Sequence, residues 1–456
     1  MTDALPLRAR LACAVCNTVR RVLRLLGHGG TNLPGKLALK LDPALPAELA
    51  RGLRIIATSG TNGKTTTCRM IAAGLEAAGI PYFANRSGAN LRAGVTAELA
   101  ANIRRGRPVK RAAVLECDEA ALRTLAGALR PEVLVFTNVF RDQLDRYGEV
   151  THTLAELEDS AKAAPEAALC LNADDSLIAS LSLDCENPVR FYGVGVPLPH
   201  DAEARSDAPN CIRCGCRYAY EYHTYAHLGG FFCPDCGYRR PTPEIEVTEV
   251  RSLERESSEI TVRIGEDAMP LHVPLGAAYN IYNALAAVSA LHAFGVDAET
   301  IRASMHAAAG FGRMEHFDLG AGVTMILVKN PAGFTQVLDY LASLDGEFDL
   351  LCCLNDNAQD GRDISWIWDV PLERLSSESI PVREVCAAGT RGEEMLLRLK
   401  HAGIASENLH LVPQYGAFLK GLSGRSRPLV IVPTYTAMMT LRPKLAKMTG
   451  AKAFWK

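Results

Sequence analysis

The sequence of 456 residues lacks several features that would each point to a different class of protein. Neither charge is in surplus, because 49 Lys and Arg stand against 51 Asp and Glu, so the whole chain is not a polycationic nucleic-acid binder. No uninterrupted apolar run reaches the roughly 18 residues that a transmembrane helix needs. Aromatic residues make up only 6% and apolar residues 48%, which is ordinary globular composition and excludes disorder, collagen and coiled coil as the main architecture.

The N-terminal segment lacks the order of a signal peptide, because arginines such as Arg8, Arg10 and Arg20 interrupt its apolar positions. It also has no acidic residue between Asp3 and Asp42. The fourteen cysteines are scattered, which favours free thiols in a reducing compartment over a disulfide framework. We therefore expect a cytoplasmic protein. Its basic N-terminal segment either packs on the core as a helix, which we favour, or makes transient contact with anionic headgroups at the inner face of the membrane.

At roughly 150 residues per domain, the length predicts about three domains. Short apolar runs that end in polar residues alternate with stretches of helical periodicity, as in parallel sheets with helical crossovers. One segment, at about 205–240, breaks this alternation and is rich in Cys, Tyr, Gly and Pro. The sequence therefore predicts an α/β fold with a basic lead-in (1–50), a central domain (51–315) that carries the odd segment as an insertion, and a smaller Rossmann-like α/β domain (316–456).

The segment ATSGTNGKTTT lies between an expected strand and an expected helix. Its glycines let backbone N–H groups turn toward a phosphate, and the N-terminus of the helix adds its dipole. Lys64 would reach the β- and γ-phosphates, and Thr65 would hold Mg²⁺. Thr58 replaces the first glycine of the general pattern, but the strand–loop–helix context is the required one. The expected nucleotide-binding residues are Gly60, Thr61, Asn62, Gly63, Lys64, Thr65 and Thr66.

A bound Mg²⁺ also needs an acidic ligand. Glu116 and Asp118 follow the next strong apolar run, at the end of a strand where open α/β sheets bind their ligands. We choose Glu116 as the magnesium ligand. The alternative is a carboxylate that only caps a helix.

Two Cys-x-x-Cys pairs, Cys211 with Cys214 and Cys233 with Cys236, have the spacing of a structural zinc ribbon. A glycine follows each pair and suits the tight turn that brings two thiolates to one metal. Four thiolates leave no open position, so the expected Zn²⁺ is structural. Disulfides or free thiols are the alternative.

The segment LNDNAQDGRDISWIWD concentrates four aspartates and two tryptophans after an expected strand. A turn that caps a helix would account for the aspartates alone. Exposed Trp beside carboxylates favours instead a surface for a protein partner.

The phosphate loop and four further motifs resemble, in order, those of the Mur ligase family. These motifs are TNVFRDQLDRYG (137–148), NADD (172–175), YNIYNALAA (279–287) and GRME (312–315). The resemblance implies that ATP phosphorylates a carboxylate and that an amine then attacks the acyl phosphate to form an amide. It also implies that Asn280 and Arg313 contact the nucleotide. About 50 residues precede the loop, so we expect no domain for a uridine nucleotide. The family's carbamylated lysine has no clear counterpart, and Lys162, the nearest, is not assigned.

The inserted Cys₄ segment, KNPAGF (329–334) and the Asp-Trp segment resemble the MurT branch of that family. This resemblance implies the synthetase subunit of lipid II isoglutaminyl synthase, which amidates the α-carboxyl of D-glutamate with ammonia. It implies a heterodimer in which the C-terminal domain contacts a GatD-type glutaminase and supplies the aspartate of its triad. An aspartate in that role fixes the tautomer of the histidine. We choose Asp363, with Asp356 as the alternate.

Two other functions stay open. A Mur-type or folylpolyglutamate-type ligase would add an amino acid in place of ammonia. A zinc-ribbon ATPase would bind nucleic acid, but the near-neutral chain and the few basic residues among the tyrosines of the insertion disfavour it. We expect no nucleic-acid partner. The chain has no Gly-x-Cys-x-Gly elbow, so ammonia would come from solution or from another chain.

Overall fold

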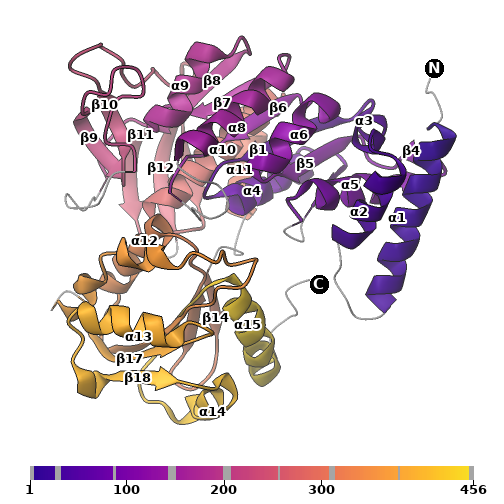
Figure 1. Cartoon of the computed structure of the whole chain (residues 1–456). Coiled ribbons are helices and arrows are strands. Elements are labelled where there is room, and N and C mark those ends of the chain that lie inside the picture. Colours follow the sequence, from indigo (N-terminus) through magenta and orange to yellow (C-terminus); the bar gives the residue numbers. More distant parts are fainter. Residues whose placement is uncertain are drawn as a thin grey trace. The chain divides into compact units, whose positions relative to one another are not determined.

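The computed structural model describes residues 5–25, 32–85, 89–141, 150–198, 207–254, 257–307, 314–377 and 380–450. These residues form two compact units (Figure 1). The first contains the described residues up to Val139 and those from Val150 to Ala307. The second contains Phe140, Arg141 and the described residues from Met314 onward.

The first unit is built on a nine-stranded sheet with the order β13-β12-β11-β8-β7-β6-β1-β5-β2. Neighbouring strands from β11 to β2 pair in parallel, and β12 and β13 extend the sheet by antiparallel pairing. The central strands are buried along almost their whole length, as expected of parallel strands covered on both faces. The strands are β1 (Arg54–Ser59), β2 (Tyr82–Ala84), β5 (Ala112–Glu116), β6 (Val133–Phe136), β7 (Ala168–Asn172), β8 (Val189–Val194), β11 (Ile245–Leu253), β12 (Ser258–Ile264) and β13 (Asp267–Val273).

The helices of the first unit pack against this sheet and one another. Helix α4 lies against α10 and α11, and α6 lies against α8. A Cβ atom on Gly74 of α4 would come within 2.2 Å of a methyl group of Leu291 in α10, so glycine permits this close approach. The helices are α1 (Leu7–Leu25), α2 (Asn32–Leu41), α3 (Leu45–Ala50), α4 (Lys64–Ala77), α5 (Arg92–Ala101), α6 (Glu119–Leu129), α8 (Val150–Ala163), α9 (Ser176–Asp184), α10 (Ala278–Ala293) and α11 (Ala298–Ala307), and a short hairpin pairs β3 (Ile103–Arg104) with β4 (Arg107–Pro108).

The basic N-terminal segment is a helix packed on the core, as we favoured. The sequence did not tell which of its faces is buried. Ala and Cys side chains form the buried face, and Leu7 and Leu25 stay 81% and 87% exposed. No helix in the described part of the chain is long and apolar enough to cross a membrane. The buried face consists of Ala9, Ala12, Cys13 and Cys16.

The segment between β8 and β11 leaves the sheet and returns to it. Because β8 and β11 are adjacent parallel strands, the excursion ends beside its own starting point. It contains a separate two-stranded sheet of β9 (Ala219–Tyr225) and β10 (Leu228–Phe232), flanked by the two Cys-x-x-Cys pairs. We call residues 207–240 the ribbon.

The second unit has a six-stranded sheet with the order β14-β15-β19-β16-β17-β18, parallel except for the β14–β15 pair. The expected α/β class with parallel-rich sheets is therefore confirmed in both units. The strands are β14 (Met314–Phe317), β15 (Val323–Ile326), β16 (Phe348–Cys353), β17 (Val382–Ala388), β18 (Leu409–Val412) and β19 (Leu429–Pro433). The helices are α12 (Pro331–Ala342), α13 (Gly392–His401), α14 (Tyr415–Lys420) and α15 (Tyr435–Thr449), with 3₁₀ turns η1 (Ser365–Trp368), η2 (Leu372–Ser376), η3 (Ser406–Asn408) and η4 (Leu422–Gly424).

Candidate active site

The loop between β1 and α4 has a backbone that two glycines make possible. Gly60 and Gly63 have φ angles of 119° and 87°, which L side chains rarely adopt. A Cβ atom on Gly60 would lie 2.4 Å from Oγ1 of Thr137, and one on Gly63 would lie 2.0 Å from Oδ1 of Asn283. The loop thus has the turn and the bare backbone that a phosphate cradle needs, immediately before the N-terminus of a helix.

The Thr-Asn pair after β6 braces this loop. The backbone N–H of Thr61 donates to the carbonyl of Asn138 at 2.9 Å, and that of Asn62 donates to Oδ1 of Asn138 at 2.9 Å. Thr137 donates through Oγ1 to the carbonyl of Asn62 at 2.7 Å. The sequence marked this pair only as part of a motif, whereas the structure gives it the role of holding the loop to the neighbouring strand.

Lys64 is almost enclosed and faces carboxylates. Its Nζ lies 2.9 Å from Oε1 of Glu119 and also donates to the carbonyl of Gly60. Burial alone would lower the pKa of Lys64, but the negative charges of Glu119, Asp118 and Glu116 raise it above its ordinary value. The amine therefore stays protonated, as a cation that faces phosphates must. The sequence analysis missed Glu119, which the first turn of α6 brings to this point.

The two residues chosen for magnesium lie together. Thr65 Oγ1 donates to Oε2 of Glu116 at 2.8 Å. Asn85 holds the backbone of Glu116 from both sides, with bonds of 2.7 Å to its carbonyl and 2.9 Å from its N–H, and Asn90 lies 3.5 Å from Oε1. A hydroxyl and a carboxylate are the hard oxygen ligands that Mg²⁺ prefers, so this donor set fits that ion. No pattern in the sequence points to either asparagine.

The remaining nucleotide candidates are placed differently. Asn283 of α10 touches the loop at Gly63, and Asn280, one turn earlier, supports it by accepting a 3.1 Å bond from its amide. Thr66 lies half-buried in the first turn of α4. Arg313 lies outside the described residues.

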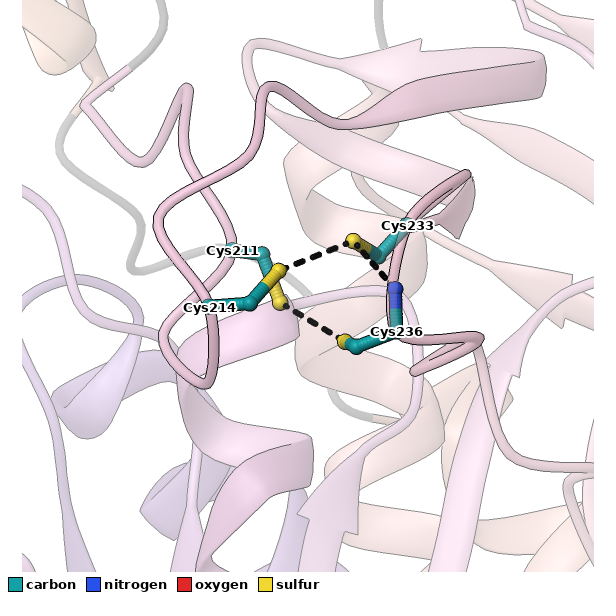
Figure 2. A group of neighbouring side chains, drawn as sticks. All are labelled: Cys211, Cys214, Cys233 and Cys236. Atoms are coloured by element: carbon teal, nitrogen blue, oxygen red, sulfur yellow. Dashed lines mark hydrogen bonds between the residues drawn. The ribbon is translucent and has the colours of Figure 1, made fainter.

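The four ribbon cysteines converge on one point (Figure 2). Their sulfur atoms all lie within 4.8 Å of one another, with Cys211 to Cys236 at 3.6 Å and Cys214 to Cys233 at 3.4 Å. No other group of three or more potential metal ligands lies this close in the described part of the chain. Four sulfur donors without a carboxylate or water position suit a closed tetrahedral zinc site.

The two cysteine turns share one geometry. In each, the N–H of the glycine donates to the carbonyl of the first cysteine, Gly215 to Cys211 at 2.8 Å and Gly237 to Cys233 at 3.1 Å. Both glycines have φ near 76° (77° and 75°), with open space around them, so conformation alone requires glycine. Backbone N–H groups of Cys236 and Asp235 lower the pKa of the Cys233 thiol to about 6, which favours the thiolate that binds metal.

In the second unit, the Asp-Trp segment forms η1 and a shallow surface depression of about 430 Å³. Asp363 lines the depression, and its Oδ1 accepts the N–H of Ser365 at 2.8 Å, so it caps η1. Trp368 is 50% exposed, with Arg398 at 5.3 Å from its ring. Trp366 is only 7% exposed because it packs against Phe334 in the core. A 3₁₀ turn thus presents one of the two tryptophans to solvent.

The other aspartates of this segment have partners. Asp356 pairs with Arg391 at 3.2 Å and accepts a 3.0 Å bond from Thr390. Asp360 is buried and accepts the N–H of Thr436 at 2.7 Å, at the start of α15. Asp369, the fourth aspartate, pairs with Arg141 at 3.4 Å. In the described part of the chain, Asp363 makes no ion pair, and its carboxylate is not buried.

Known proteins match this chain along most of its length. The description "Mur ligase middle domain" fits residues 58–204, and "MurT ligase C-terminal" fits residues 327–438. The subunit MurT of lipid II isoglutaminyl synthase (glutamine-hydrolyzing) from Streptococcus pneumoniae is 34% identical over 93% of this chain and 94% of its own length. The chain belongs to the MurT family. The MurT subunit from Staphylococcus aureus is 32% identical over 96% of this chain and 98% of its own.

Solved structures agree on the fold of the MurT family member described here. A MurF from Acinetobacter baumannii has a TM-score of 0.64 at 18% identity, over 90% of this chain and 80% of its own. A MurF ligase from Thermotoga maritima, in complex with ADP, has a TM-score of 0.59 at 14% identity, over 90% and 85%. At these identities the likeness concerns the fold alone, and it confirms the Mur ligase architecture expected from the motifs.

Proposed function

We propose that this chain is the synthetase subunit of a lipid II isoglutaminyl synthase and uses ATP to amidate the α-carboxyl of D-glutamate in lipid II. The observation that carries the proposal is the joined set of Lys64, Thr65 and Glu116 at a glycine loop, in a chain related over nearly its full length to MurT subunits. The same set would serve any Mur-type ligase, so the nature of the amine is what the experiment must decide.

The proposed chemistry has two steps. A carboxylate oxygen attacks the γ-phosphorus of ATP, the bond to the β-phosphate oxygen breaks, and ADP leaves an acyl phosphate. Ammonia then attacks the carbonyl carbon, loses a proton to solvent and expels inorganic phosphate. The loop N–H groups and the protonated Lys64 hold the phosphates and balance their charge, which is most of what phosphoryl transfer requires. Mg²⁺ at Thr65 and Glu116 would neutralise further charge on the phosphates.

The relatives are named as subunits, which supports a partner chain for this protein too. We propose that the partner is a GatD-type glutaminase that supplies ammonia and forms a heterodimer through the second unit. Asp363 would accept the Nδ1–H of the partner's catalytic histidine and stabilise the imidazolium form. Within the described residues no cation pairs with Asp363, which lies beside an exposed Trp, and this supports the role for Asp363 over Asp356, whose charge Arg391 already balances.

We further propose that α1 touches the inner face of the membrane during turnover. Its outward face combines Leu7, Leu11 and Leu25, all exposed, with arginines, a composition that suits anionic headgroups. Co-sedimentation with vesicles tests this. The chain should bind vesicles rich in phosphatidylglycerol and not neutral ones, and the double variant Leu7→Gln/Leu11→Gln should lose that binding. Equal recovery with both vesicle types would contradict it.

The experiment for the main proposal is mass spectrometry of lipid II after incubation with the chain, ATP and Mg²⁺. One arm receives an ammonium salt, a second receives glutamine alone, and a third receives glutamine with the GatD-type subunit. We expect a carboxyl-to-amide mass change in the first and third arms and none in the second. A mass increase equal to an added amino acid, when one is supplied, would identify an amino-acid ligase instead. No change in any arm would sink the proposal.

A further inference from the structure

The ribbon is fastened to the rest of the first unit by buried polar bonds as well as by apolar packing. Tyr218, Phe231 and Tyr238 form an aromatic cluster with the cysteines Cys211 and Cys233. The ring centroid of Phe231 lies 5.3 Å from that of Tyr218 and 5.4 Å from that of Tyr238. The hydroxyl of Tyr238 donates to the carbonyl of Ser176 at the start of α9, at 2.8 Å. Two further polar contacts of the ribbon are made to Asp174 and Asp175, the two aspartates that follow β7.

Asp174 lies at the centre of the first fastening and is completely buried. Its Oδ1 accepts a 2.6 Å bond from Nε of Arg240, the residue with which the ribbon ends. Its Oδ2 accepts 2.6 Å from the hydroxyl of Tyr282 and 2.7 Å from the N–H of Val194, where β8 ends. A carboxylate that is shielded from water depends on all of these donors, because the loss of any one of them leaves part of its negative charge without a hydrogen-bond partner.

Tyr282 carries this fastening to the phosphate loop. Its hydroxyl also bonds Oγ1 of Thr224 in β9, at 2.5 Å, so α10 is tied to the ribbon directly at Thr224 and indirectly through Asp174. The next residue of α10 is Asn283, whose side chain touches the loop at Gly63. The position of α10 against the ribbon therefore sets the position of Asn283 against the loop.

Asp175 makes a second, separate link. His227, in the turn between β9 and β10, lies with Nε2 at 3.7 Å from Oδ1 of Asp175, and both side chains are fully buried. Oδ2 of Asp175 accepts the N–H of Val139 at 2.9 Å, and the preceding residue, Asn138, holds the loop at Thr61 and Asn62. Two chains of contacts thus lead from the ribbon to the loop, one reaching it at Gly63 and the other at Thr61 and Asn62.

We propose that zinc in the ribbon and ATP in the loop are thermodynamically coupled through Tyr282 and the Asp174–Asp175 pair. Zinc keeps the ribbon in the shape that presents Thr224, His227 and Arg240 to these groups, and so positions the loop for nucleotide. Tyr282 is a positioning residue here, since it acts through Asn283. The inference rests on the zinc and nucleotide sites proposed above and goes beyond a role for the metal in fold stability alone.

The test is calorimetric titration of ATP with Mg²⁺ into the full-length chain, with zinc bound and after removal by a chelator that is then dialysed away. We expect the Kd for ATP to rise about tenfold on zinc removal, within the usual range of coupling between sites, and to return when Zn²⁺ is added back. Linkage requires the reverse effect as well. ATP should raise the affinity for zinc, measured by competition with a colorimetric chelator, by the same factor.

Tyr282→Phe isolates the link, because it removes one hydroxyl and leaves the cysteines and the loop untouched. In the zinc-loaded variant the Kd for ATP should already be several-fold higher, and zinc removal should add less than it does in the wild type, because only the link through Asp175 remains. Tyr238→Phe is the matched control. Its hydroxyl bonds the carbonyl of Ser176, at 2.8 Å, and takes part in neither link, so ATP affinity should match that of the wild type.

The outcomes separate the inference from the proposals beneath it. A folded wild-type chain that binds both ligands with independent affinities would overturn the coupling alone, as would Tyr282→Phe with wild-type affinity for ATP. A wild-type chain that binds no zinc, or no ATP, would overturn the coupling together with that site. If zinc removal unfolds the chain, the ATP affinities of zinc-loaded Tyr282→Phe and Tyr238→Phe decide the question.

Discussion

The two units place polar residues at the carboxyl ends of parallel strands, yet use them in opposite ways. In the first unit, polar groups that can act on a ligand are bonded to one another, as the largely buried Lys64 is to Glu119 and Thr65 is to Glu116. In the second, polar groups beyond the strand ends tie the chain to itself, as Asp360 does at the start of α15. Asp363, which makes no ion pair within the described part of the chain, lies instead in a shallow depression beside an exposed Trp.

This difference indicates which chemistry the chain completes alone. A site with its cation, hydroxyl and carboxylate already positioned needs only substrates, because preorganised charges do not have to be rearranged during the reaction. A half-exposed carboxylate beside an aromatic side chain has few partners of its own and suits a surface that a second protein covers. The same sheet architecture thus holds a set of preorganised polar groups in one unit and an exposed carboxylate with few partners in the other.

The largest effect should come from Lys64→Met, which keeps the apolar stem and removes the charge. We expect ammonium-driven amidation to fall at least about 10³-fold, because the phosphates lose their fixed cation. Amide formation on lipid II, followed by mass spectrometry, measures this. Lys162→Met is the control, since that lysine is half-exposed and pairs only with Glu158, and it should keep wild-type activity. Loss of activity in the control would instead identify Lys162 as the counterpart of the family's carbamylated lysine.

Asp363→Asn tests the role of the second unit in glutamine-driven amidation. Glutamine-driven amidation with the partner should fall about 10²–10⁴-fold, because an amide cannot balance the charge of a histidinium. Ammonium-driven amidation, which bypasses glutamine hydrolysis, should stay close to that of the wild type. Asp356→Asn is the matched variant and should lose much less of the glutamine-driven rate. The opposite ranking of the two would exchange their assignments.

Trp368→Ala tests whether the depression is a partner surface. Removing an exposed aromatic anchor should weaken binding of the glutaminase by about 1–3 kcal/mol, or roughly 5- to 150-fold in Kd, measured by calorimetry. Leu183→Ala removes an apolar side chain of similar exposure from the first unit and should leave the affinity unchanged. Equal affinity for both variants would move the interface elsewhere.

The smallest effect concerns His227 and pH. Burial alone would lower the pKa of His227, but the nearby Asp175 raises it above its ordinary value. A raised folded-state pKa contributes stability below the unfolded pKa of about 6.5, and this contribution is lost as the pH rises through the folded-state value. Urea unfolding of zinc-loaded wild type and His227→Gln should therefore differ by about 1 kcal/mol more at pH 6 than at pH 9. A constant difference would contradict a charged His227.

The sequence predicted what depends on neighbours along the chain. The glycine loop, the strand before it and the acid after the next strand follow from local patterns, and the cysteine spacing specified two similar turns. Asn85 and Glu119 were missed because the sheet order β6-β1-β5-β2, set by long-range pairing, brings them beside Glu116 and Lys64.

The features that the sequence did not predict depend on packing between segments that are distant along the chain. The direction of the turn at η1 determines that Trp366 is buried and Trp368 exposed, although each has Ile367 on one side and a polar residue on the other. The buried face of α1 consists of small side chains, which helical periodicity alone ranks below the leucines of the outward face. The links from Asp174 to Arg240 and Tyr282 join segments 66 and 108 residues away, which no local pattern encodes.

The placement of the ribbon has a consequence for how the chain folds. Residues 195–244 separate β8 from β11, and these strands must meet before β12 and β13 can join the sheet. Closing so long a segment costs chain entropy that is recovered only when the strands pair, which slows folding. Zinc bound by Cys211 and Cys236 during synthesis would link these two residues, so the residues between them would no longer add to the length of the loop between β8 and β11. The metal would then speed the step that completes the sheet, and metal starvation would delay maturation of the chain as it leaves the ribosome.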